Sequence, residues 1–125
     1  MPAKSGSEPS RRAWDVRLSF AAEADLENIV LWTADQFGER QARAYESILK
    51  NALSSLREGP AVAGARPRPE IAHGLYSMHA ARRSRRARHF IFFHVVNDGW
   101  IEVVRVLHDG MDFQRHLSSD EPGET

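Results

Sequence analysis

The densest group of residues able to contact an anion is a run of arginines in the second half of the chain. Five arginines stand within seven positions and are followed directly by His89; they are Arg82, Arg83, Arg85, Arg86 and Arg88. Arginine presents a planar, permanently charged fork that matches phosphates and carboxylates. Five such charges repel one another unless an anion lies nearby. We expect this cluster to contact nucleic-acid phosphates or an acidic protein segment, with an ordinary solvated turn as the alternative.

Histidine is the usual proton donor and acceptor near neutral pH, and the chain has six histidines. A ribonuclease needs one group to take the 2′-hydroxyl proton, another to protonate the leaving oxygen, and cations beside the scissile phosphate. If the chain is a nuclease, the candidates for these catalytic roles are His79, Arg83, His89, Arg105 and His116. His108 is expected instead to hydrogen-bond near Asp109 or Asp112.

Other chemistries have little support in the sequence. Asp112 and His116 are four positions apart, a spacing that suits a hydrogen bond on one helix face as well as a metal pair, but no third ligand follows at a recognisable interval. The chain has no cysteine and no glycine-rich phosphate cradle. We therefore expect no metal and no cofactor. The three tryptophans, Trp14, Trp32 and Trp100, are expected to pack in the core rather than to stack on bases.

The overall charge balance hides a segregation of charge along the chain. The 125 residues contain 17 basic and 17 acidic side chains. Seven arginines and one acid, Glu70, lie in residues 66–94, whereas residues 98–125 contain seven acids and only two bases. A length of 125 residues is typical of one domain. A charged macromolecule is therefore the expected kind of partner.

The two ends of the chain are expected to lie outside the fold. Residues 1–13 have almost nothing to bury and are predicted to be a disordered arm, and residues 118–125 are predicted to be an acidic flexible tail. The domain is then residues 14–117. No stretch reaches the roughly 18 apolar residues of a membrane span, and residues 1–12 lack a signal-peptide core. We expect a cytoplasmic protein without membrane contact.

The first half of this domain is predicted to be a strand followed by a helical hairpin. Trp14, Val16 and Leu18 alternate with polar residues, as in a half-buried strand. Ser19 can then cap a helix that ends at Gly38. A second helix begins near Glu39 and ends at Gly59-Pro60, with the apolar stripe Ala42, Tyr45, Ile48, Leu49, Ala52, Leu53 and Leu56.

The second half is predicted to be a small antiparallel sheet. Residues 61–74 are expected to form a surface loop, and residues 75–79 are a weak strand candidate. Residues 90–96 are apolar on both faces and indicate a central strand, which a turn at residues 97–99 connects to a last strand over residues 100–107. The fold class is therefore α+β, with a helical hairpin packed on a three- to four-stranded, mainly antiparallel sheet.

One face of the central strand is not accounted for by the helical hairpin. Phe90, Phe92 and Val96 point to one side of the sheet, and Ile91, Phe93 and Val95 point to the other. A single hairpin covers only one of these faces. We expect a partner chain that folds onto the sheet to cover the other, with the arm, the Arg66 loop and the tail as the alternative cover.

An ordered set of short motifs extends over most of residues 18–117. In the hairpin these motifs are Leu18-Ser19, Ala22, Asp25-Leu26, Ile29, Phe37-Gly38 and Ala42. Further along they are Gly59-Pro60, Gly64, Gly74-Leu75, Arg88-His89-Phe90-Ile91-Phe92-Phe93, Val103-Val104-Arg105-Val106-Leu107-His108, Met111-Asp112-Phe113 and His116-Leu117. In this ordered set the chain resembles the ParE branch of the RelE/ParE toxin superfamily.

The resemblance implies a toxin that a ParD-type antitoxin neutralises by folding around it. For the ParE branch it also implies that the free toxin inhibits DNA gyrase and stops replication and growth, as a binding inhibitor and not as an enzyme. The residues expected to contact the target or the antitoxin are Arg82, Arg83, Arg85, Arg86, Arg88, Met111, Asp112, Phe113 and His116.

The chain departs from the pattern of its apparent relatives at three positions. Tyr76 stands where relatives commonly have arginine, Phe93 where many have tyrosine, and His94 where arginine is frequent. Members that share this fold differ in their target, so two alternatives stay open. One is a RelE-like, ribosome-dependent mRNA interferase; the other is an inactive homologue that only binds its antitoxin.

Overall fold

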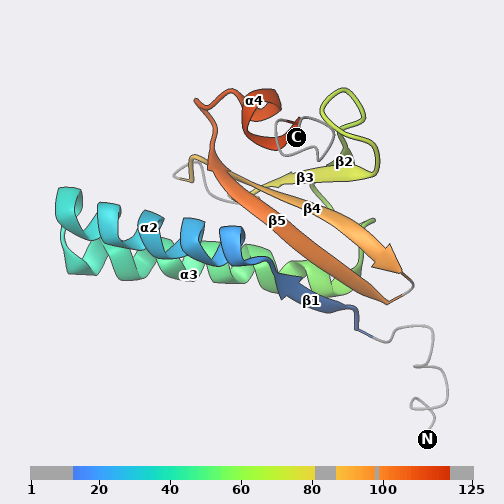
Figure 1. Ribbon diagram of the computed structural model, residues 1–125. Helices are drawn as coiled ribbons and strands as arrows, with labels where there is room; N and C mark the ends of the chain where they lie inside the picture. The colour runs from blue at the N-terminus through green and yellow to red at the C-terminus, as the bar shows by residue number, and fades with distance from the viewer. Residues whose placement is uncertain (1–12, 81–86, 98, 119–125) are drawn as a thin grey trace, which may run out of the picture.

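The computed structural model describes residues 13–80, 87–97 and 99–118, which form an α+β fold (Figure 1). A five-stranded sheet has the strand order β1-β5-β4-β3-β2. The strands are β1 (Asp15–Leu18), β2 (Ala65–Pro67), β3 (Leu75–His79), β4 (His89–Asn97) and β5 (Trp100–His108). The helices are α2 (Phe20–Phe37), α3 (Glu39–Ser55), the 3₁₀ turn η2 (Leu56–Glu58) and α4 (Phe113–Ser118).

The helical hairpin begins and turns where the sequence predicted. The hydroxyl of Ser19 accepts a hydrogen bond from the amide of Ala22 at 3.0 Å and so caps α2. The same hydroxyl donates to the carbonyl of Val104 at 2.9 Å and fixes the helix start on the sheet. Gly38 has a φ of 96°, which allows the chain to reverse between α2 and α3.

The sheet is antiparallel except at one edge, where β1 pairs in parallel with β5. The central β4–β5 pair contains two register shifts. Phe92 pairs with Arg105 and Phe93 with Val103, so Val104 is an extra residue in β5. Such a bulge changes which side chains face which side of the sheet. As a result Val103 and Val106 both belong to the core under the hairpin.

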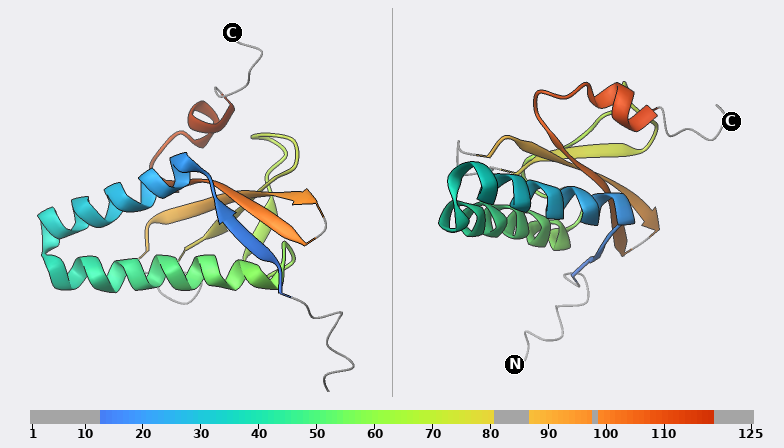
Figure 2. Two further views of the ribbon diagram at one scale, coloured as in Figure 1. Left: turned by 60° about the horizontal axis from the view of Figure 1, so that its bottom comes forward. Right: turned by 60° about the vertical axis from the view of Figure 1, so that its left-hand side comes forward.

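That core lies between the hairpin and one face of the sheet. Its largest fully buried side chains include Leu49 and Leu56 from the α3–η2 segment and Ile91, Phe93 and Ile101 from the two central strands. Trp14 packs against the same core. The other views show the two helices running along this side of the sheet and extending past its end (Figure 2).

The opposite face of the sheet is covered by the chain itself, and the preferred prediction of a partner chain there is wrong. Residues 68–74 and α4 lie over this face on the side away from the hairpin (Figures 1 and 2). They enclose a second cluster in which Phe113 contacts Phe92 and Phe90 edge-on, with ring centroids 4.8 and 5.4 Å apart. Arg68 donates a hydrogen bond to the hydroxyl of Ser77 on β3 at 3.0 Å and so holds residues 68–74 on the sheet.

Two further expectations are corrected. The predicted surface loop over residues 61–74 contains the edge strand β2, so the sheet has five strands instead of three or four. Trp32 does not pack in the core; it is 58% exposed on α2, whereas Trp14 and Trp100 are half-buried. The predicted arm and tail, apart from residues 13 and 118, lie outside the described residues. No helix in the described part of the chain is both long and apolar enough to cross a bilayer.

Candidate functional site

Most of the predicted arginine cluster cannot be placed, because Arg82, Arg83, Arg85 and Arg86 lie outside the described residues. Arg88 is described, and its side chain is 63% exposed. Its Nε lies 3.1 Å from Oδ2 of Asp109, and this ion pair lowers the pKa of the Asp109 carboxyl. The end of the cluster is therefore anchored beside the last residues of β5.

The predicted C-terminal contact residues separate into two groups. Met111 is 43% exposed, and Asp112 accepts a hydrogen bond from the amide of Arg115 at 3.2 Å through its side chain. Phe113 belongs to the second cluster, and His116 is half-buried on the same helix. Phe113 thus holds α4 on the sheet, while Met111 and Asp112 remain open to a partner.

The candidate nuclease residues lie on different faces and in different contacts. His89 contacts Tyr45 on the hairpin side of the sheet, whereas His116 lies on α4, which covers the other side. Arg105 is bound to Asp25 of α2 at 2.8 and 3.0 Å. Arg83 lies outside the described residues. His79 on β3 contacts the ring of Phe90 and interacts electrostatically with His89 and Asp109. Of the described candidates, His79 and His89 therefore lie near each other, whereas His116 lies on the element that covers the face opposite the hairpin.

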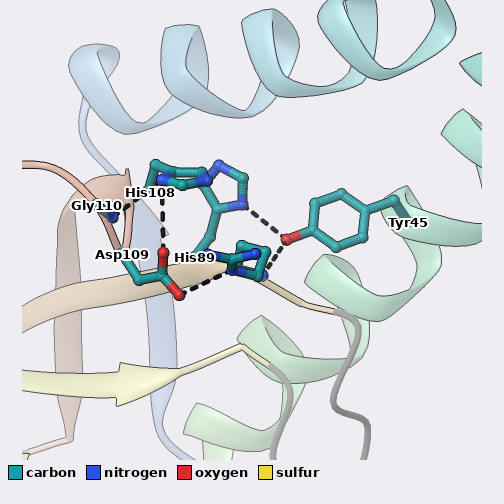
Figure 3. A network of polar contacts seen from close by, with 6 residues as sticks. Tyr45, His89, His108, Asp109 and Gly110 are labelled. Atoms are coloured by element: carbon teal, nitrogen blue, oxygen red, sulfur yellow. Dashed lines mark hydrogen bonds and ion pairs between the residues drawn. The ribbon is translucent and has the colours of Figure 1, made fainter. Parts of the chain in front are cut away.

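What the structure does bring together is a network around the hydroxyl of Tyr45 (Figure 3). Tyr45 points from α3 toward the start of β4, where its oxygen lies 2.7 Å from Nδ1 of His89 and accepts the amide of Arg88 at 2.9 Å. The ring of His89 meets the ring of His108 edge-on, with centroids 5.2 Å apart. His108 in turn accepts the amide of Gly110 on Nδ1 at 2.9 Å.

Burial keeps two members of this network, Tyr45 and His89, uncharged near neutral pH. Burial raises the pKa of Tyr45, so its hydroxyl stays protonated. Burial, and then the neighbouring His108, lower the pKa of His89 to about 4. His89 is therefore a neutral imidazole at pH 7. Arg88 and Asp109 provide the two formal charges of the network, and they pair with each other.

Next to the network lies a pocket of about 480 Å³ between the hairpin and the ends of β4 and β5. α2 and α3 extend past the end of the sheet in this region (Figure 2). Its walls are mainly apolar, and its polar groups come from both helices and from the strand ends. It is lined by Trp32, Thr33, Phe37, Gln41, Ala44, Tyr45, Ile48, Arg88, His89 and His108.

A smaller hollow of about 370 Å³ lies near the start of α2 and contains Arg105 and two histidines. His94 lies 2.8 Å from a carboxylate oxygen of Glu102, and Arg105 is bound to Asp25. No group of three or more histidine or acidic side chains among the described residues is arranged to hold a metal ion.

With this geometry established, comparison with known proteins decides the family. The family model described as the ParE toxin of the type II toxin–antitoxin system, parDE, matches residues 16–113. This chain belongs to the ParE toxin family. The match begins in β1 and ends at the first residue of α4, so it spans both layers of the fold.

Curated ParE toxins agree with this assignment along nearly their whole length. Toxin ParE1 of Mycobacterium tuberculosis (strain ATCC 25618 / H37Rv) is 37% identical over 100 residues, which are 80% of this chain and 94% of that protein. Toxin ParE1 of Caulobacter vibrioides is 30% identical over 101 residues, which are 81% of this chain and 95% of that protein.

Solved structures show the same fold at lower identity. The chromosomal ParDE TA system from P. aeruginosa contains a chain that matches with a TM-score of 0.63 at 18% identity, covering 78% of this chain and 97% of that one. The toxin–antitoxin complex RelBE2 from Mycobacterium tuberculosis contains a chain that matches with a TM-score of 0.52 at 18% identity, covering 77% and 98%. The ParE assignment and the RelE/ParE-like fold are thus consistent.

Sequence reasoning missed the centre of the network in this ParE-family protein. Tyr45 was interpreted only as one position of the apolar stripe of α3. His108 was interpreted only as a residue near Asp109, and the two side chains do approach to 3.5 Å. A signal for Tyr45 was present, because a buried tyrosine hydroxyl usually requires a hydrogen-bond partner. The identity of that partner, 44 positions away, was not readable.

Proposed function

We propose that this chain is the toxin of a type II toxin–antitoxin module, inhibits DNA gyrase and is neutralised by a ParD-type antitoxin. The observation that carries the proposal is the family match over residues 16–113, together with relatives named Toxin ParE1 that align over 94% and 95% of their length. The proposed mode of action is binding.

The action of such a toxin requires that it meets its target in the cytoplasm as a folded domain. We place the functional domain at residues 14–117 and the protein in the cytoplasm. The proposed contacts with the target or the antitoxin are the arginines of residues 82–88 and the exposed end of β5 with α4, where Met111, Asp112 and His116 lie. Phosphate contacts by the arginines would position the toxin without reading base sequence.

The test is to express the chain alone in bacteria and to pulse-label DNA and protein synthesis in the first minutes. An early loss of DNA synthesis, with translation continuing, is the expected result. An early loss of translation would replace gyrase inhibition with ribosome-dependent mRNA cleavage. Continued synthesis of both would leave an inactive homologue that only binds an antitoxin. Purified gyrase with the purified chain then provides a direct supercoiling assay.

The contribution of the arginine cluster is tested by replacing Arg82, Arg83, Arg85 and Arg86 together with glutamine. The matched control replaces four arginines that are exposed elsewhere on the surface, Arg40, Arg43, Arg57 and Arg66. Both variants lose the same total charge. The proposal predicts that only the first variant loses growth arrest or antitoxin affinity. Equal losses in the two variants would show that net charge alone is responsible.

A further inference from the structure

The hydrogen bonds of the Tyr45 network determine which ring nitrogens carry protons. On His108, Nδ1 accepts the amide of Gly110 at 2.9 Å, so the proton of the neutral ring is on Nε2. A carboxylate oxygen of Asp109 lies 3.5 Å from the same Nδ1, which has only its lone pair to offer. The ring of His108 therefore presents an N–H donor on the side away from Gly110.

The same argument applies to His89. The oxygen of Tyr45 already accepts the amide of Arg88, and its hydroxyl proton is retained because burial raises the pKa of the phenol. With Tyr45 assigned as the donor of its 2.7 Å hydrogen bond to Nδ1 of His89, the neutral imidazole carries its proton on Nε2. Two adjacent imidazole rings thus each have an N–H group that is not used by the network in Figure 3.

The two histidines that carry these N–H groups belong to the lining of the pocket. Both His89 and His108 line it, and in the described part of the chain no fully buried side-chain nitrogen or oxygen lacks a hydrogen-bond partner. Neither Nε2 has a hydrogen-bond acceptor among the described residues. Among the described residues of the lining, Arg88 is the one charged side chain, and it is paired with Asp109. The preference for a carboxylate over a neutral carbonyl therefore comes from the two N–H donors, which bind an ionised acceptor more strongly.

The rest of the pocket fits a large apolar group. Trp32 and Phe37 form an edge-to-face pair at 5.8 Å on α2 and are 58% and 63% exposed. Ala44 and Ile48 of α3 continue this wall. Exposed aromatic pairs of this kind gain binding energy when a partner covers them. Because the aromatic wall lies on the outer end of two helices, a protein segment can reach it and the imidazole pair together.

We propose that this pocket binds a segment of the partner protein in which an acidic residue stands next to a large apolar one. The carboxylate accepts hydrogen bonds from Nε2–H of His89 and His108, and the apolar side chain packs on Trp32 and Phe37. The inference rests on the proposed function, in which the partner is the antitoxin. It adds the chemistry by which this chain recognises that partner.

The first test uses the full-length chain labelled with ¹⁵N-histidine and two small probes, indole-3-propionate and indole-3-propanamide. The histidine spectra are expected to show the Nε2–H form for both His89 and His108. The carboxylate probe is expected to shift these two signals and to bind at least about fivefold more tightly than the amide, because only it makes charge-assisted hydrogen bonds. Equal binding of the two probes, or no shift at about 10 mM, would overturn the proposal.

The second test measures how much the N–H donor of His108 contributes to binding. His108→Leu removes the donor, whereas His108→Gln keeps an N–H at nearly the same place and should restore binding. His73→Leu, at an exposed histidine outside the pocket, is the control. With the protein encoded beside the chain's own gene as partner, we expect roughly a tenfold loss of affinity for the leucine variant and less than about threefold for glutamine. Equal losses for leucine and glutamine would contradict the role of the donor.

These results are separable from the proposed function. Growth arrest by the chain alone does not depend on the pocket in this proposal. If the chain arrests growth but binds the two probes equally, only the pocket assignment is wrong. If the chain prefers the carboxylate probe but does not arrest growth, the proposed toxin activity is wrong and the binding site stands. Circular dichroism and urea unfolding of each variant show whether a loss of binding comes from a loss of folding.

Discussion

The carboxylate of Asp25 on α2 holds the guanidinium of Arg105 on β5 through two hydrogen bonds, at 2.8 and 3.0 Å, across 80 positions of sequence. Asp25 also accepts the backbone amide of Val106 at 2.9 Å. The two side chains are only 14% and 24% exposed. These contacts form where the extra residue Val104 shifts the β4–β5 register. A bulge in the sheet and an acid in the helix therefore fix the position of the hairpin together.

The Asp25–Arg105 pair leads to a prediction about stability. Asp25→Ala should lower the free energy of unfolding by about 2–4 kcal/mol, because it removes the carboxylate that a largely buried guanidinium and a backbone amide both contact. Asp15→Ala is the matched control, since Asp15 pairs with Arg17 at 3.0 Å but both side chains are more than half exposed. The control should change stability by less than about 1 kcal/mol. Urea unfolding measures both, and similar losses would contradict the prediction.

The pH dependence of stability should contain a contribution from His89. Its pKa is about 4 in the folded chain and 6.5 in an unfolded one, so the unfolded state binds more protons between these values. The contribution is fully present above pH 6.5 and is lost as the pH falls toward 4. Allowing for partial exposure of the ring, the loss is about 1–2 kcal/mol.

Two variants isolate this contribution from that of the carboxylates. His89→Gln cannot take up the proton, so its stability should fall less between pH 7 and pH 4 than that of the parent chain. His73→Gln, at an exposed position, should follow the parent curve. Denaturant unfolding at a series of pH values gives the curves, and parallel curves for all three proteins would show that His89 does not titrate in this way.

The hydroxyl of Tyr45 should matter for stability in a way that the other tyrosine does not. Tyr45→Phe removes the acceptor of the Arg88 amide and the donor to His89, and should cost about 1–2 kcal/mol. Tyr76 stacks on Phe93 at 5.2 Å through its ring, a contact that phenylalanine preserves. Tyr76→Phe should therefore change stability by less than about 0.5 kcal/mol. Thermal or urea unfolding compares the pair, and a reversed order would contradict the assignment.

The cover on the second face of the sheet should depend on Phe113. Phe113→Ala should destabilise the chain by about 2–3 kcal/mol, because Phe90 and Phe92 lose the ring that packs against them. Met111→Ala, two residues earlier and exposed, should have almost no effect on stability. If Met111 contacts a partner, its replacement should reduce binding at unchanged stability. Unfolding and binding measured on the same two variants separate these roles.

Much of the fold was predictable because its signals are local. The Ser19 cap, the reversal at Gly38 and the periodic apolar positions of α2 and α3 depend on residues close in sequence, and the structure confirms them. The central strand β4 was recognisable because it is apolar on both faces. The edge strand β2 was missed because three residues that include Pro67 carry no strand signal of their own and gain order only by pairing with β3.

The candidate site was predictable only in part. The sequence pointed to His89 and Arg88, which do lie together, but also to Arg105 and His116, which do not join them, and it assigned His108 only a structural hydrogen bond. Tyr45 and Trp32 were both assigned to the core, yet one is the centre of a polar network and the other forms the exposed wall of a pocket. Tyrosine and tryptophan have both apolar and polar surface. The spacing of apolar residues alone therefore does not show whether such a side chain lies inside the core or at its edge.

By itself the sequence determined the α+β class, the helical hairpin and its capping residues, the central strand and the family, because these depend on local spacing and on an ordered set of motifs. Tertiary structure alone decided which side chains meet. The extra residue at Val104 sets the faces of β5, α4 covers the sheet face that the sequence left open, and the helices extend past the sheet to form the pocket. Long-range pairing sets all three, since a shift of one residue in register moves side chains to the opposite face.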